Sequence, residues 1–258
     1  MVTKSFYQSR ETQKLDWTTI SGYARTLKRL QTLINLKMKD IILDVGCGAG
    51  HLAIPLLNYG ANVIGMDISR YNIRHIKNLG KHLEIVIADA ERLPFRNTSF
   101  DKVFAFGVLE HLPNPERALN EIRRCLGDEG KLSMLQTYRL DHYQIIWHRL
   151  LYKLRLTTNP VSSIEKEHIN QFKPEVWRQL ITKCGLTLTT VIPTSILPTL
   201  PFYYALSIIP PNLKNTYFNL PLLRSVDAWL KAKSAIADKL ALAYMYVSVK
   251  RESAKDNG

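Results

Sequence analysis

The chain has 258 residues, of which 46% are hydrophobic, and it carries a formal net charge of +13. This composition excludes a disordered or low-complexity chain, and the length allows one α/β domain with a substantial insertion. Three widely spaced cysteines argue against a disulfide framework and against a zinc site, so we expect no bound metal. The first residues lack the apolar stretch of a signal peptide, and we therefore expect a cytoplasmic protein.

The positive charge is concentrated outside the middle of the chain. Residues 41–136 hold 11 basic and 11 acidic side chains, residues 1–40 hold 8 against 3, and residues 137–258 hold 16 against 8. A basic excess in the flanks favours an anionic substrate, an anionic membrane surface or RNA as a partner. A charge that serves only solubility is the other explanation.

Short apolar runs that predict strands alternate with patterns of helical spacing along the chain. In the first half we expect a helix at 18–36, a strand at 40–45, a helix at 51–58, a strand at 62–66, a helix at 69–79, strands at 84–88 and 100–106, a helix at 114–126 and a strand at 131–135. In the second half we expect helices at 138–156 and 174–184, a strand at 186–192, a helix at 225–240 and a strand at 243–249.

This order predicts a doubly wound, Rossmann-like α/β fold. The sheet would have seven strands, mostly parallel, with helices on both faces and a helical, apolar cap inserted in the C-terminal part. We expect residues 1–39 to form a helical lid and residues 40–136 to form the core. Residues 137–258 would complete the sheet and carry the cap, in insertions at about 137–172 and 193–224.

A glycine-rich turn follows the first expected strand and carries most of the functional information. It reads Asp44-Val45-Gly46-Cys47-Gly48-Ala49-Gly50, with His51 where a dinucleotide-binding fingerprint has its third glycine. Glycines at a strand-to-helix turn allow backbone N–H groups to approach a ligand closely. The carboxylate of Asp44 would repel a pyrophosphate and attract an ammonium group.

Aspartates also mark the ends of the next two expected strands. Asp44, Asp67 and Asp89 follow three successive apolar runs, and parallel strands end at one edge of a sheet, where open α/β sheets bind ligands. Any one of these aspartates is also explained as a turn former or helix cap. The three together favour a ligand site.

Taken in order, the motifs resemble those of class I methyltransferases that depend on S-adenosylmethionine (SAM), and of their small-molecule, ubiquinone/menaquinone methyltransferase-like branch. The resemblance covers residues 41–135, less than half of the chain. It rests on ILDVGCGAG (42–50), GMDIS (65–69), ADAERLPF (88–95), SFD (99–101), VLEHL (108–112), EIRRCL (121–126) and GKL (130–132). It implies SAM as the methyl donor and direct displacement at its methyl carbon.

The resemblance also implies a role for each residue that binds the donor. Asp67 would accept the ribose hydroxyls, Asp89 and the Ala90 backbone would recognise the adenine edge, and Ile68, with Leu93, would pack on the adenine faces. The residues implied at the methionine end are Asp44, Gly46, Cys47, Gly48, Gly50 and Gly107.

The acceptor side is less specific in the sequence. Glu110 and His111 follow the fourth expected strand and are candidates for a catalytic base, although His111 is equally explained by local packing. His168 lies in a segment that faces the acceptor in the resembling family. The proline-broken apolar stretch within 193–224 and the basic, aromatic helix at 138–156 favour a hydrophobic or lipid-like acceptor met at an anionic membrane surface. The alternatives are an internal cap, methylation of tRNA or another RNA, and a non-catalytic SAM-binding protein.

Overall fold

The computed structural model describes the central part of the chain and a strand near its C-terminus. The described residues are 28, 30–78, 83–138, 153, 169–170, 172–195 and 243–250. The helix expected at 225–240, almost all of the one at 138–156 and most of the one at 18–36 lie outside the described residues, as does the apolar stretch after residue 195. The division into lid, core and cap therefore stays a prediction.

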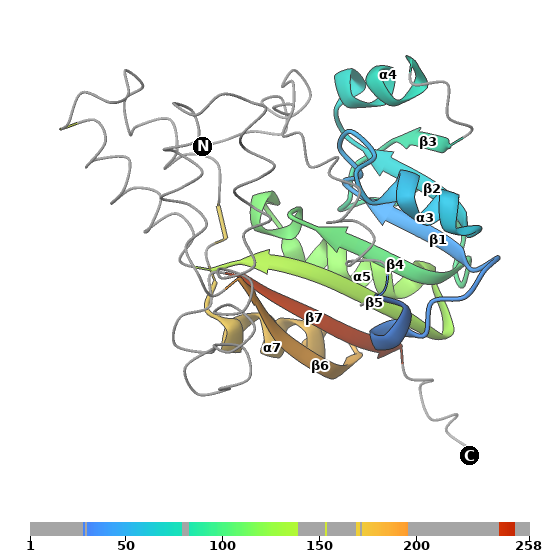
Figure 1. Cartoon of the computed structure of the whole chain (residues 1–258). Coiled ribbons are helices and arrows are strands. Elements are labelled where there is room, and N and C mark those ends of the chain that lie inside the picture. Colours follow the sequence, from blue (N-terminus) through green and yellow to red (C-terminus); the bar gives the residue numbers. More distant parts are fainter. Residues whose placement is uncertain are drawn as a thin grey trace.

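A seven-stranded sheet forms the centre of the protein (Figure 1). Its strand order is β3-β2-β1-β4-β5-β7-β6, and β7 runs in the direction opposite to the other six strands. The expected Rossmann-like, mostly parallel sheet is confirmed. The strands are β1 (Ile41–Val45), β2 (Asn62–Asp67), β3 (Glu84–Ile87), β4 (Phe100–Phe106), β5 (Leu126–Thr137), β6 (Leu186–Ser195) and β7 (Ala243–Lys250).

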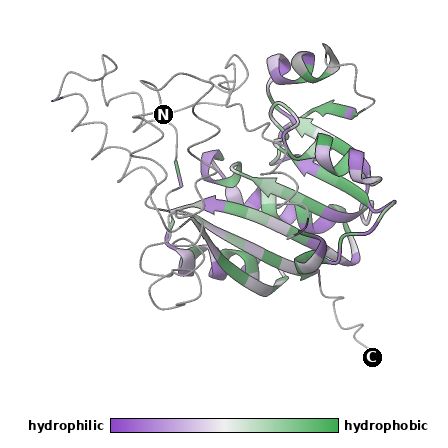
Figure 2. Ribbon diagram, viewed as in Figure 1, coloured by the Kyte–Doolittle hydropathy of each residue, from purple (hydrophilic) through white to green (hydrophobic). Residues whose placement is uncertain are grey.

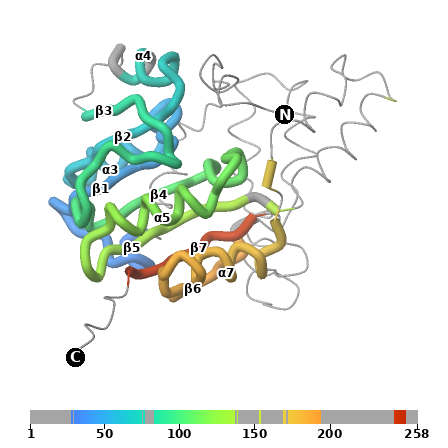
Figure 3. Tube along the Cα trace, turned by 180° about the vertical axis from the view of Figure 1, so that it is seen from behind, coloured from blue at the N-terminus to red at the C-terminus, as the bar shows by residue number. Residues whose placement is uncertain are grey.

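Helices cover both faces of this sheet. In Figure 1, α3 lies in front of β1 and β2, whereas α5 and α7 lie on the opposite face, which Figure 3 shows. The hydropathy colouring of Figure 2 shows that apolar residues dominate the strands between these layers. The helical elements are α3 (Ala53–Tyr59), α4 (Arg70–Asn78), the short 3-10 helix η1 (Leu109–His111), α5 (Pro115–Cys125) and α7 (Pro174–Lys183).

Each face of the sheet has its own apolar core, because side chains alternate between the two faces of a strand. On one face, Leu119 of α5 and Trp177 of α7 are buried against β4, β5 and β7. On the other, Leu56 of α3 packs with Leu30 and Ile34. Within the described residues, no helix has the length and apolar character needed to cross a bilayer.

Local signals explain where the helices begin and end. Asn114 caps α5, accepting a hydrogen bond from the backbone N–H of Arg117 at 2.9 Å, and a proline occupies the first turn. Gly60 ends α3 in the left-handed conformation, with φ of 100°. Both features were expected from the sequence.

Three of these elements differ from their expected bounds by two residues or more, and others differ by one. The helix α3 begins at Ala53, because residues 51–52 still belong to the turn. The strand β5 begins at Leu126, several residues early, because that residue already pairs with β4. The strand β6 continues to Ser195 through Pro193, which is tolerated because β6 lies at the edge of the sheet.

Candidate functional site at the carboxyl ends of the strands

The structure brings the three strand-end aspartates to one edge of the sheet. Asp44 lies in β1 and Asp67 ends β2, and the backbone of these parallel strands is in register, with Asp44 opposite Gly65. The carbonyl of Asp67 accepts a hydrogen bond from the N–H of Ala88 at 3.2 Å, which places Asp89 immediately beyond the neighbouring end of β3. The strand order reverses between β1 and β4, so this edge is the topological switch point of the sheet.

The glycine-rich loop is tied to the end of β2. The N–H of Gly48 donates to Oδ2 of Asp67 at 2.8 Å, and the N–H of Cys47 donates to the carbonyl of Met66 at 2.9 Å. Gly46, Gly48 and Gly50 all have positive φ, at 68°, 53° and 81°. The loop therefore depends on glycine for its backbone path.

Cys47 contributes to the loop differently from the glycines beside it. Its side chain is buried in the core on the α3 face, where a side chain on Gly65 would approach the sulfur to 3.0 Å. Burial raises the pKa of the Cys47 thiol, which therefore stays protonated. The thiol thus faces the protein interior, and a part in ligand binding would fall to the backbone.

Asp67 is buried, with 8% of its surface exposed, and it organises the loop through both carboxylate oxygens. Oδ1 accepts from the N–H of Ser69 and Oδ2 from the N–H of Gly48, each at 2.8 Å. Burial still raises the pKa of Asp67, although these hydrogen bonds oppose the shift. Hydrogen bonds from the side chain of Asn72 and from the backbone of Ile68 also oppose the shift, so this carboxylate is tied to the start of the next helix as well as to the loop.

Asp44 is a strongly perturbed carboxylate at this edge. It is 3% exposed, and its Oδ2 has no hydrogen-bond partner among the described residues. Burial, and next the negative charge of Asp67, raise the pKa of Asp44 to about 7. A buried carboxylate in this state is suited to a cation, which would compensate both causes of the shift.

The segment that carries Asp89 begins with a tight turn after β3. Oδ1 of Asp89 accepts from the N–H of Glu91 at 3.0 Å, and the carbonyl of Asp89 accepts from the N–H of Arg92 at 2.9 Å. The side chains of Ala90 and Leu93 are buried in the core on the α5 face. Ile68 is only partly buried. Of the side chains expected to pack on the adenine faces, it is the one with exposed surface.

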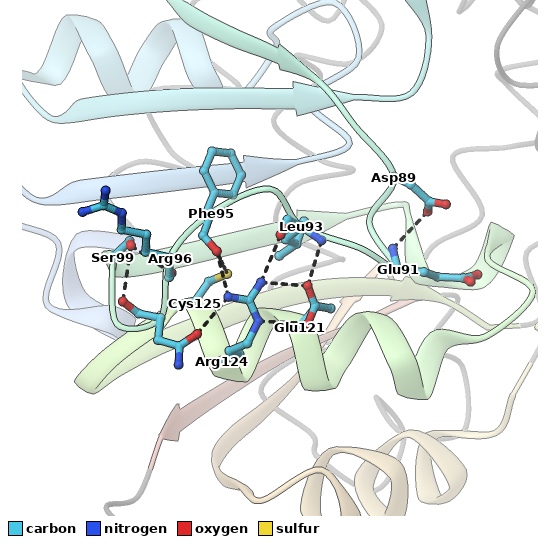
Figure 4. Close-up of polar contacts among 10 residues, drawn as sticks. Asp89, Glu91, Leu93, Phe95, Arg96, Ser99, Glu121, Arg124 and Cys125 are labelled. Atoms are coloured by element: carbon cyan, nitrogen blue, oxygen red, sulfur yellow. Dashed lines mark hydrogen bonds and ion pairs between the residues drawn. The ribbon is translucent and has the colours of Figure 1, made fainter.

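Two residues of α5 hold this segment in place, as Figure 4 shows. The guanidinium of Arg124 donates to the carbonyls of Leu93 at 3.0 Å and Phe95 at 2.7 Å. Glu121 accepts from Arg124 and from the N–H of Leu93 at 2.9 Å, and the Arg124 hydrogen bonds hold the pKa of Glu121 below its ordinary value. These hydrogen bonds clamp the backbone of Leu93 and Phe95 to α5.

We expect Arg124→Lys to lower the free energy of unfolding by about 1–3 kcal/mol, because an ammonium cannot reproduce the planar set of donors. Urea unfolding followed by circular dichroism measures this loss. Arg117→Lys is the matched control, since Arg117 lies on the same helix with an exposed side chain. Equal stability of the two variants would contradict a clamping role for Arg124.

The acceptor-side candidates lie just beyond β4. The N–H of Gly107 donates to the carbonyl of Leu135 at 3.1 Å, and a side chain on Gly107 would come within 4.0 Å of Oε1 of Glu110. Glu110 is 1% exposed and His111 is partly buried, both on η1. The structure therefore brings Gly107 and Glu110 together, next to the end of β5.

A residue that the sequence analysis did not single out supports η1. The side-chain amide of Asn170 donates to the carbonyls of Leu109 at 3.2 Å and Leu112 at 2.6 Å. The backbone N–H groups of Ile169 and Asn170 both donate to the carbonyl of Glu110 at 2.9 Å. His168 lies outside the described residues, but its neighbours bring this segment to η1. The signal that the sequence offered was a polar residue two positions after His168.

Comparison with known proteins identifies the domain. Residues 43–134 match the family model described as a methyltransferase domain. The match covers less than half of the chain. This stretch contains the glycine-rich loop, Asp67, Asp89 and η1, so the candidate site and the matched domain coincide.

Relatives of the methyltransferase domain act, by their names, on different acceptors. The chain is 41% identical over 109 residues to an uncharacterized protein of Methanocaldococcus jannaschii, covering 42% of this chain and 41% of that protein. It is 32% identical over 111 residues to a sterol 24-C-methyltransferase of Saccharomyces cerevisiae, covering 40% and 29%. It is 34% identical over 119 residues to a demethylmenaquinone methyltransferase of Lactobacillus johnsonii, covering 43% and 49%. The chain thus spans less than half the length of each.

Solved structures share the fold of the methyltransferase domain and of the strands around it. A methyltransferase of Haloferax volcanii, solved in complex with the Trm112 methyltransferase activator, superposes with a TM-score of 0.60 at 18% identity, over 90% of this chain and 92% of that one. A SAM-dependent methyltransferase of Methanosarcina mazei gives 0.55 at 18% identity, over 84% and 95%. The fold is the Rossmann-like class I methyltransferase fold, and SAM is the methyl donor that the sequence motifs predict for it.

The residues at the carboxyl edge fit this donor. SAM carries an ammonium group, and the unbonded Oδ2 of buried Asp44 is suited to such a cation. The space beside Gly48, where a side chain would meet nothing within 4 Å, leaves the loop backbone open to a ligand. Within the described part of the chain, no cluster of three His, Cys, Asp or Glu side chains is placed to hold a metal ion.

Proposed function

We propose that this protein transfers a methyl group from SAM to a small, hydrophobic or lipid-like acceptor. The observation that carries the proposal is the buried Asp44 carboxylate beside Asp67 and the glycine-rich loop, inside the matched domain. Relatives named for sterol and quinone substrates support an apolar acceptor. The apolar segment Leu200–Ile209 supports it from the sequence.

Each residue of the site has a proposed task in binding the donor. Asp44 would hold the ammonium, and the backbone of Gly46, Cys47, Gly48, Gly50 and Gly107 would line the methionine end. Asp67 would accept from the ribose hydroxyls. Asp89, Ala90 and Ile68 would form the adenine site. SAM supplies a methyl group that is already activated on a sulfonium, so the protein mainly has to align the acceptor and exclude water.

Glu110 and His111 are the proposed catalytic residues if the acceptor has to lose a proton. Glu110 is buried on η1 and lies next to Gly107, at the methionine end of the proposed donor site. His111 is the next residue and is partly exposed. Asn170 is the proposed positioning residue, because it bonds to the carbonyls before and after these two residues.

Transfer of labelled methyl groups tests this function directly. The full-length protein is incubated with labelled SAM and cell extract, and the extract is then divided into organic-soluble, RNA and aqueous small-molecule fractions. We expect the label in the organic-soluble fraction. Label in the RNA fraction alone would contradict the proposal.

RNA is the second candidate acceptor, and the charge distribution is the observation that favours it. The 16 basic residues against 8 acidic ones in residues 137–258 give a positive region beyond the neutral core. Binding to RNA through phosphates would weaken steeply with salt. The same fractionation separates this outcome from a lipid-like acceptor.

An anionic membrane surface is the proposed meeting place with the acceptor. The argument is the basic and aromatic composition of residues 138–156, which suits anionic headgroups. Flotation with liposomes tests it: we expect the protein to float with anionic vesicles at low salt and to be released at high salt. Failure to float at low salt would contradict the membrane model, without bearing on methyl transfer.

A further inference from the structure

The side chain of Gln136 is a buried polar group that the fold leaves unsatisfied. It is 1% exposed, and neither its Nε2 nor its Oε1 has a hydrogen-bond partner among the described residues. Buried polar groups in folded proteins are nearly always hydrogen-bonded, and an amide without partners destabilises the fold. Within the described residues this amide thus has both its donor and its acceptor capacity open to a ligand.

Gln136 lies on the acceptor side of the site. It is the penultimate residue of β5, at the carboxyl end of the strand. The preceding residue, Leu135, accepts the hydrogen bond from Gly107, and η1 contacts β5. Gln136 is thus the residue next to Leu135, whose carbonyl binds Gly107. The donor and acceptor sides of the proposed site adjoin at Gly107.

Two tyrosine side chains lie on the same face of the sheet as Gln136. Tyr244 of β7 lies directly opposite it in the antiparallel register, and directly opposed side chains share a face. Tyr138 is two residues further along and shares that face, and its ring lies 6.4 Å from the ring of Tyr244. A polar group among aromatic rings is typical of a site for an apolar ring compound with one polar substituent.

We propose that the amide of Gln136 binds a hydroxyl group carried on an apolar ring of the methyl acceptor. An amide offers both a donor and an acceptor, and a hydroxyl complements both. This inference rests on the proposed function and narrows its acceptor to hydroxylated ring compounds. Tyr138 and Tyr244 would provide the apolar contacts of the ring.

A pair of matched probes tests the proposal by binding. The probes are a para-alkylphenol and its analogue in which a methyl group replaces the hydroxyl, titrated into the full chain with S-adenosylhomocysteine present. We expect the wild-type protein to bind the phenol about tenfold more tightly than the analogue. Gln136→Met, which keeps the length of the side chain, should bind both probes equally. Binding without discrimination by the wild type would overturn the proposal.

Stability distinguishes a ligand-binding role from a structural one. An apolar residue in place of an unsatisfied amide should leave the melting temperature unchanged or raise it by about 2–4 °C. Gln136→Leu repeats the test with a second shape. If both variants melt lower or fail to fold, the amide has a structural partner, such as a buried water, and the proposal is wrong.

Ser248→Ala is the matched control. Ser248 is also buried, its Oγ also has no hydrogen-bond partner within the described segments, and it shares the face of Gln136. It lies opposite Leu132, four residues before Gln136 on β5 and near the middle of that strand. We expect this variant to keep full discrimination between the probes. A wild type that discriminates between them but places labelled methyl groups only on RNA would contradict the proposed function and leave the Gln136 site intact.

Discussion

Gly46→Ala should remove most SAM binding and destabilise the fold. A Cβ at this position would lie 2.3 Å from Cγ2 and 3.2 Å from Cγ1 of Val108, and Gly46 has φ of 68°. The left-handed conformation costs about 1–2 kcal/mol for a residue with a side chain, and overpacking costs about 1–3 kcal/mol more. We therefore expect the free energy of unfolding to fall by roughly 2–5 kcal/mol.

In the Gly46→Ala variant, SAM affinity should fall by more than the loss of folding stability alone would cause. Val108 directly precedes η1 and follows Gly107, so a side chain on Gly46 would displace both the loop and the start of the acceptor side. We expect SAM affinity measured by calorimetry to fall at least about tenfold, which corresponds to about 1.4 kcal/mol.

Two further variants separate the clash from the backbone effect. Gly48 also has positive φ, at 53°, but a side chain there meets nothing within 4 Å. Gly48→Ala should therefore lose only about 1–2 kcal/mol of stability. Adding Val108→Ala to the Gly46→Ala variant should restore the part of the free energy of unfolding that overpacking removes. Equal losses for the two glycine variants, or no recovery in the double variant, would contradict this account.

The sequence predicted the parts of the site that depend on local patterns. Strand ends at Asp44, Asp67 and Asp89 follow from short apolar runs, and the turn at Gly46 follows from glycine spacing. These signals are local because a buried parallel strand is a continuous apolar run. The caps at Asn114 and Gly60 were predictable for the same reason.

Contacts between distant segments could not be predicted in this way. Nothing near Val108 in the sequence indicates that Gly46 has to leave room for it. Similarly, Asn170 is an ordinary polar residue until the fold places it on the carbonyls of η1. The insertion of β7 between β5 and β6 is a further case, because strand order depends on the whole topology.

Cys47 and Gln136 show how burial changes the interpretation of a residue. Cys47 stands among the loop glycines in sequence, but its side chain enters the core because Gly65 leaves room for the sulfur. Gln136 has no feature in sequence that separates it from any glutamine near a strand end. Its importance becomes visible only when the fold buries it with no hydrogen-bond partner in the described part of the chain.

Asp44→Asn should weaken SAM binding and remove its dependence on pH. Asp44 has a pKa raised from 3.8 to about 7, chiefly by burial and then by the charge of Asp67. A bound ammonium favours the ionised carboxylate, so binding below pH 7 should release a proton. The affinity of the wild-type protein should therefore rise with pH by up to about tenfold per unit and level off above about pH 7. The asparagine variant should bind about 10–100-fold more weakly at pH 7.5, since a charged hydrogen bond is lost.

Asp101→Asn is the matched control for the loss of one negative charge. Asp101 is exposed, and its Oδ2 accepts from the N–H of Ile41 at the amino end of β1, the opposite edge of the sheet. Calorimetry in buffers of different ionisation enthalpy measures both the affinity and the number of protons released. Equal proton release by the wild type and the Asp44→Asn variant would contradict the assignment of the cation site to Asp44.

The same carboxylate should make the ligand-free protein less stable as the pH rises. Because the pKa of Asp44 is higher in the folded state than in the unfolded state, the folded protein holds this proton more tightly. The contribution of Asp44 to the free energy of unfolding is thus largest at low pH. It falls between about pH 4 and pH 7 by at most about 1.4 kcal/mol per pH unit, and it is constant above about pH 7. The difference in unfolding free energy between wild type and Asp44→Asn isolates this contribution from other titrating groups. With saturating SAM, the difference in unfolding free energy between the two proteins should no longer depend on pH above about pH 5. The bound ammonium stabilises the Asp44 carboxylate, which burial disfavours in the ligand-free protein.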